Sequence, residues 1–67
     1  MNKAIQTIDK WIDISKSTLN YLKEEMQRVL KNQDYLTAGM YAAQMKGYTD
    51  VLGTLELIKK EIEEAKE

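Results

Sequence analysis

The sequence predicts an all-α protein, an antiparallel two-helix hairpin that self-associates into a helical bundle. Its 67 residues include no proline and one clear interruption, at 31–34. Apolar residues recur with a coiled-coil period before this interruption, and no segment alternates as a strand does. We expect a single domain, 1–67, with helices at about 3–31 and 34–66. The loop at 32–33 is so short that the two helices must run antiparallel.

The first expected helix, about 3–31, has two apolar rows with heptad spacing, which predict a seam against a partner helix. A run of short polar residues follows Ile14, and such side chains compete for backbone hydrogen bonds. A break near Ser15–Ser17 is therefore left open. The rows are Ile5, Ile12, Leu19 and Met26, and Ile8, Ser15, Leu22 and Val29.

The interruption has residues suited to end one helix and begin another. Asn32 can adopt the left-handed conformation that closes a helix. Asp34 is a good N-cap because its carboxylate can accept the free amides of the next turn. We expect Asn32 to end the first helix and Asp34 to cap the second.

The second expected helix, about 34–66, has a wide apolar surface. Between Tyr35 and Leu55 only Lys46 and Asp50 are charged, and the apolar arc covers roughly 220°. We expect the stripe that packs against the first helix to continue through this half. That stripe is Met40, Gln44, Tyr48, Val51, Leu55, Ile58, Ile62 and Ala65.

Both helices carry more apolar surface than a hairpin uses, which predicts a second copy. The first helix has an extra stripe beside its seam, and the second has a row of small residues, Gly39, Ala43 and Gly47, that permits close approach. A chain this short has a marginal core, and without Cys or His it lacks disulfides and the usual metal ligands. We expect a dimer that forms a four-helix bundle. The expected self-association interface is Trp11, Ile14, Tyr21, Met40, Ala43, Gly47 and Tyr48.

The composition excludes several function classes. Without His or Cys, Ser15 and Ser17 have no obvious base, so we expect no enzyme, metal or cofactor. A net charge of −1 with mixed signs argues against nucleic-acid binding. No apolar run reaches the roughly 20 residues that span a bilayer. We expect a cytoplasmic protein.

Two tyrosines of the second helix suggest an alternative hypothesis, in which this helix binds a ligand. Tyr41 and Tyr48 are seven residues apart on one helical face, and aromatic rings near Lys46 or Arg28 could stack a nucleobase and balance a phosphate. The possible ligand-binding residues are Arg28, Tyr41, Lys46 and Tyr48. Tyrosine at helical spacing is more typical of an interface.

The second helix also resembles a class of small proteins. Lys46-Gly47-Tyr48 and Leu52-Gly53, leading into Leu57-Ile58-Lys59-Lys60, resemble small helical-hairpin accessory proteins of bacteriophages and mobile elements. The resemblance covers the second helix only. It implies action without catalysis, through binding a host protein or sequestering a signalling molecule between subunits.

We therefore predict a non-catalytic, oligomeric helical binding or regulatory protein that acts on another protein, such as a phage-encoded inhibitor or accessory factor. One alternative is a sponge that sequesters a nucleotide-like signalling molecule at a subunit interface. A second alternative is a structural component of a larger assembly.

Overall fold

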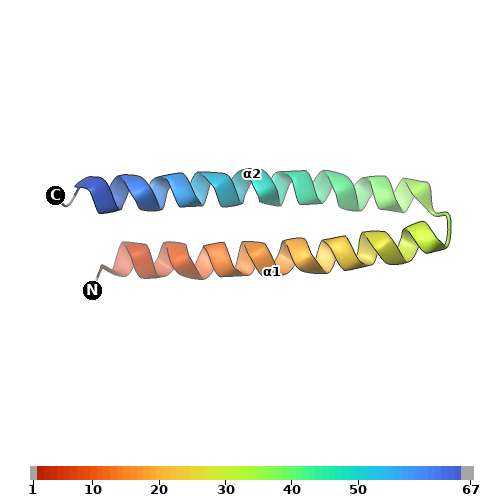
Figure 1. The fold of residues 1–67 in the computed structure, drawn as a ribbon, viewed down its shortest axis with the longest axis horizontal. Helices are drawn as coiled ribbons and strands as arrows, with labels where there is room; N and C mark the ends of the chain where they lie inside the picture. The colour runs from red at the N-terminus through yellow and green to blue at the C-terminus, as the bar shows by residue number, and fades with distance from the viewer. Residues whose placement is uncertain (1, 66–67) are drawn as a thin grey trace.

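Two long helices lie side by side and antiparallel in the computed structural model, which describes residues 2–65 (Figure 1). Helix α1 spans Lys3–Lys31 and helix α2 spans Tyr35–Ala65. The molecule measures 52 × 16 × 10 Å, with the first turn of α1 and the last turn of α2 at one end and the loop at the other. The all-α hairpin is confirmed. Residue 66, the expected end of the second helix, lies outside the described residues.

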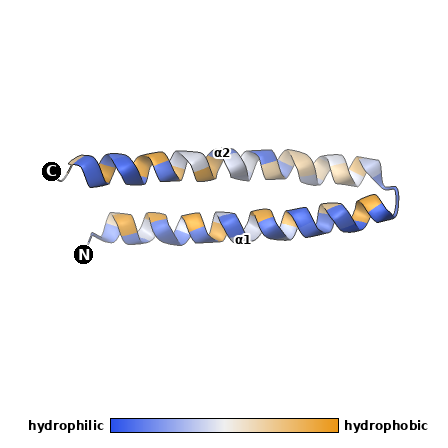
Figure 2. Ribbon diagram, viewed as in Figure 1, coloured by the Kyte–Doolittle hydropathy of each residue, from blue (hydrophilic) through white to orange (hydrophobic). Residues whose placement is uncertain are grey.

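Helix α1 packs through the predicted heptad seam. Its buried residues are Ile12, Ser15, Leu22 and Val29, and hydrophobic colour follows its side towards α2 (Figure 2). Its first turn is capped by Asn2, whose side-chain oxygen accepts the amides of Ala4 and Ile5 at 2.8 and 3.4 Å. Sequence reasoning had not assigned this cap.

The helix does not break at Ser15–Ser17. The Ser15 hydroxyl is buried in the seam and donates to the carbonyl of Trp11 at 2.8 Å, while Thr18 donates to Ile14 at 2.9 Å. These i to i−4 bonds satisfy the short polar side chains within the helix. The polar run that suggested a break is therefore compatible with a continuous helix.

The loop uses a different left-handed residue from the one predicted. Asn32 has φ −91°, whereas Gln33 has φ 58°. The amide of Gln33 donates to Leu30 O at 3.0 Å and that of Asp34 to Val29 O at 3.0 Å. This pair of bonds is the Schellman motif, which requires the left-handed residue one position after the cap. The assignment to Asn32 was wrong by one residue.

Asp34 begins α2 as predicted. Its Oδ1 accepts the amide of Thr37 at 3.1 Å, and its carbonyl accepts the amide of Ala38 at 3.1 Å. Hydrogen bonds from the side chain and the backbone amide of Thr37 lower the pKa of the Asp34 carboxyl group. Since its own amide closes α1, Asp34 joins the two helices directly.

Helix α2 turns a different stripe towards α1 from the one predicted. Six of the eight residues predicted for the core stripe are exposed: Met40, Gln44, Tyr48, Val51, Ile58 and Ala65. The α1 seam repeats every 3.5 residues, so its partner must supply the same period. The seam residues of α2 that are buried or half-buried are Ala38, Tyr41, Met45, Leu52, Leu55, Lys59 and Ile62.

Candidate interaction surface

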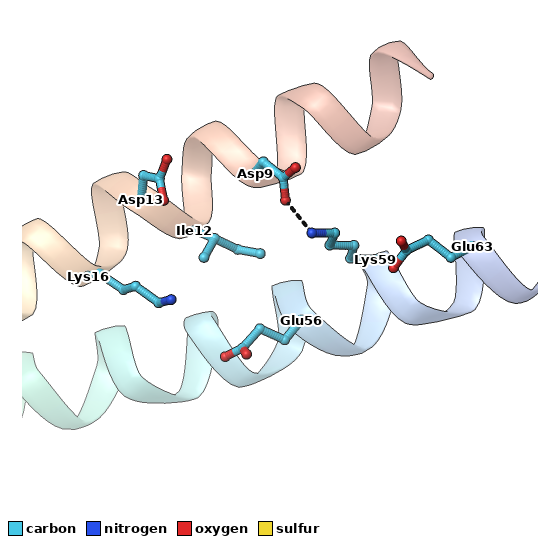
Figure 3. A pocket seen from close by; sticks show the side chains of 7 residues that line it. All are labelled: Asp9, Ile12, Asp13, Lys16, Glu56, Lys59 and Glu63. Carbon is cyan, nitrogen blue, oxygen red and sulfur yellow. Dashed lines mark ion pairs between the residues drawn. The ribbon is translucent and has the colours of Figure 1, made fainter. Parts of the chain in front are cut away.

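One side of the hairpin, here called the charged face, carries ionised side chains from both helices. Asp9, Asp13 and Lys16 flank the α1 seam, and Glu56 and Glu63 flank the α2 seam beside Lys59 (Figure 3). Together with Ile12 these six residues line an open groove of ≈ 540 Å³. Four of the six are acidic and two are basic, so the groove is acidic with mixed signs.

An ion pair crosses the charged face. The Lys59 ammonium lies 2.7 Å from Asp9 Oδ1, and the two side chains point towards each other in Figure 3. Their hydrogen bond raises the pKa of Lys59. The Lys59 stem lies in the seam while its charge reaches the surface, as long basic side chains commonly do. Within residues 2–65, no group of three acidic side chains is placed to hold a metal ion.

The opposite side of the hairpin, here called the apolar face, is lined by large exposed side chains. At 3.6 residues per turn, Trp11, Ile14 and Tyr21 stand on the side of the α1 seam away from Asp9. Trp11 is 51% exposed and Tyr21 57% exposed. From α2 this face receives Met40, Gly47, Tyr48, Val51 and Ile58, all of them exposed.

A hollow of ≈ 380 Å³ opens on the apolar face of α2. It is lined by Gln44, Gly47, Tyr48 and Val51. These residues have the spacing i, i+3, i+4, i+7, which is the four-residue hole that receives a side chain in coiled-coil packing. A Cβ atom at Gly47 would meet nothing within 4 Å. The glycine therefore deepens the hole on a surface that α1 does not cover.

A polar cluster borders the apolar face towards the loop. Arg28 Nε donates to Glu25 Oε2 at 2.6 Å, and Tyr21 Oη donates to Glu25 Oε1 at 3.3 Å. The charge of Glu25 and the hydrogen bond between Tyr21 and Glu25 raise the pKa of Tyr21. The hydrogen bond from Arg28 lowers the pKa of Glu25. The Tyr21 hydroxyl group thus has a partner on its own helix, which leaves its ring as open apolar surface.

The seven expected interface residues are all exposed in the single hairpin. Six of them, Trp11, Ile14, Tyr21, Met40, Gly47 and Tyr48, belong to the apolar face. The seventh, Ala43, lies on the outer side of α2, turned away from α1.

The four possible ligand-binding residues do not all converge. Arg28 on α1 lies near Tyr41 on α2. Lys46 lies two residues from Tyr48, and residues at this spacing point to different sides of a helix. The structure therefore brings Arg28 and Tyr41 together, whereas Lys46 points to a different side of α2 from Tyr48.

Sequence reasoning missed two members of the apolar face, Val51 and Ile58, because it placed them in the core. The signal that finds them is the period of the α1 seam. A strict seven-residue repeat through Leu52 and Lys59 puts Val51 and Ile58 one position outside the seam. Lys59 obscures that repeat because it is a charged residue at a seam position.

Comparison of the chain with protein-family models, curated proteins and solved structures finds no match. Neither α1 nor α2 combines the length and the apolar content that crossing a membrane requires.

Proposed function

We propose that this protein is a non-catalytic, self-associating binding module that acts on another protein. In this proposal two hairpins pair through their apolar faces and form a four-helix bundle. The dimer is the working unit, and its charged faces point outwards.

The exposed area of the hairpin carries the proposal. The chain has an accessible surface of 5191 Å², whereas a typical folded monomer of 7.8 kDa has about 4,400 Å². The excess, about 800 Å², is what each partner buries in a standard protein interface. No large side chain among residues 2–65 is fully buried. A second copy on the apolar face would provide the core that one hairpin lacks.

A substitution on each side of the molecule tests the pairing. Replacing Trp11 by Ala should weaken the dimer about tenfold or more, since large aromatic residues dominate such interfaces. Leu57, which is exposed on the outer side of α2, gives the matched control, and Leu57→Ala should leave dimerisation unchanged. Equal dissociation constants for the two variants, measured by analytical ultracentrifugation, would refute the role of the apolar face.

The charged face is the surface that we assign to a partner protein. Its mixed signs suit protein recognition better than binding to a phosphate backbone. A double variant, Asp13→Lys with Glu56→Lys, should dimerise normally but lose the protein that the wild type captures from cells. Capture of the same protein at the same level by both forms would refute this assignment.

A second candidate function, sequestration of a nucleotide-like molecule, is supported by the proximity of Arg28 to Tyr41. Arg28 is already paired with Glu25, which opposes an anionic ligand. A thermal-shift screen against cyclic and linear nucleotides tests it. A rise of several degrees that Tyr41→Ala abolishes would favour this function, and no shift would reject it.

A further inference from the structure

The ion pair between the helices marks which residues of α1 and α2 lie at the same height along the hairpin. Asp9 pairs with Lys59, and the helices are antiparallel. Tyr21 is twelve residues after Asp9, and Gly47 is twelve residues before Lys59. At 1.5 Å per residue both lie about 18 Å from the ion pair, at the same height on the apolar face.

Two hairpins can stack face to face in two symmetric ways. If the two-fold axis runs along the helices, the loops meet at one end, and α1 of each copy covers α2 of the other at equal height. If the axis crosses the helices, the loops point in opposite directions, and α1 covers α1. Only the first arrangement brings the ring of Tyr21 opposite Gly47 of the second copy.

The sizes of the side chains favour the first arrangement. On the apolar face α1 presents Trp11, Ile14 and Tyr21, whereas α2 offers the hole at Gly47. Large side chains packed against small ones interdigitate without voids. In the second arrangement the bulky stripe of α1 would face its own copy, and the hole would face a second α2.

We propose that Tyr21 of each hairpin enters the hole at Gly47 of its partner, with both loops at the same end. This inference rests on the proposed dimer. The hole supplies the four-residue lining of a coiled-coil socket, and the tyrosine supplies an exposed ring at the matching height. The Tyr21 hydroxyl keeps its hydrogen bond to Glu25 at the rim, while the ring is buried. Tyrosine suits this position because it combines an apolar ring with a polar tip.

A distance between spin labels tests the orientation. The chain has no cysteine, so a Lys31→Cys variant carries one label per copy, next to the loop. With the loops together, the two labels should lie within about 30 Å of each other; with the loops apart, they should be more than about 40 Å apart. A dimer with the long distance would overturn the inference but leave the proposed dimer intact. The absence of any dipolar coupling, with a monomer mass, would overturn both.

Two matched glycine variants test the hole. Neither Gly47 nor Gly53 has an atom that a new Cβ would meet within 4 Å, and both are exposed on α2, so we expect both substitutions to Leu to leave the hairpin folded. Gly47→Leu fills the hole and should weaken the dimer about tenfold or more, whereas Gly53→Leu, outside the apolar face, should change it less than about threefold. Equal effects would overturn the role of the hole.

Conservative variants of Tyr21 separate its ring from its hydroxyl. Tyr21→Phe keeps the ring and should dimerise as the wild type does, within about threefold, while Tyr21→Ala should lose about tenfold or more. If Tyr21→Ala dimerises normally, the ring does not enter the hole.

Discussion

The ammonium of Lys59 lies 2.7 Å from the carboxylate of Asp9, and this contact joins the C-terminal part of α2 to the N-terminal part of α1. Both side chains are partly exposed, and exposed pairs contribute little to stability. The pair matters more for register, because a polar contact at one height disfavours a shift of one helix along the other.

Replacing Asp9 by Asn should therefore lower the melting temperature by no more than about 4 °C in low salt. In 1 M salt the difference from wild type should nearly vanish, since screening weakens the wild-type pair. Thermal unfolding by circular dichroism at both ionic strengths measures this. A difference that is independent of salt would show that Asp9 acts other than through its charge.

The core of the hairpin should be sensitive at Leu22, which is 4% exposed. Leu22→Ala removes buried methyl groups at a cost of about 2–5 kcal/mol, which is most of the stability of a chain this small. We expect a large loss of helical circular dichroism at 25 °C. The control Leu57→Ala should change the free energy of unfolding by less than about 0.5 kcal/mol. Similar behaviour of the two variants would contradict the assigned seam.

Replacing the left-handed residue of the loop by glycine should stabilise the protein. Gln33 has φ 58°, a conformation that costs a residue with a side chain about 1 kcal/mol, whereas glycine adopts it freely. Gln33→Gly should raise the free energy of unfolding by about 0.5–1 kcal/mol in urea denaturation. The same change at Asn32, where φ is −91°, should not stabilise the protein. Stabilisation by Asn32→Gly alone would contradict the loop geometry.

The cap of α2 should give stability a dependence on acid pH. The pKa of Asp34 is lowered by its hydrogen bonds with Thr37, so the stabilisation is present above the unfolded pKa of about 3.9 and is lost as pH falls through the lower folded value. Asp34→Ala should lower the melting temperature by about 4–8 °C at pH 7 and by less near pH 2. Asp34→Asn keeps an accepting oxygen and should lose less than Asp34→Ala at pH 7. A deficit of Asp34→Ala that does not change with pH would refute this account.

Local signals in the sequence were enough to predict α1, its seam and the cap at Asp34. The isoleucines and leucines of α1 form one stripe, so only one face could be buried. The α2 seam was not predictable from α2 alone, because its apolar arc contains two stripes that share Leu55 and Ile62. At other positions the two stripes are displaced by one residue, so that the predicted stripe contains Met40 and the observed seam contains Tyr41. The choice between them depends on the heptad period of α1, which is a tertiary property.

The apolar face was only partly predictable for the same reason. Trp11, Ile14 and Tyr21 were recognised because they lie outside an unambiguous seam. Val51 and Ile58 became members only when the true α2 seam was known. The hole at Gly47 depends on four side chains around one exposed glycine, and their spacing alone did not separate a hole from a contact with α1.

The central claim is that two hairpins cover each other's apolar face, and sedimentation equilibrium at micromolar concentrations tests it most directly. We predict a mass of twice 7.8 kDa that does not grow further as concentration rises. Continued growth of the mass would instead favour a component of a larger assembly, because an interface that does not close extends without limit. A folded, stable monomer of 7.8 kDa at these concentrations would contradict the claim.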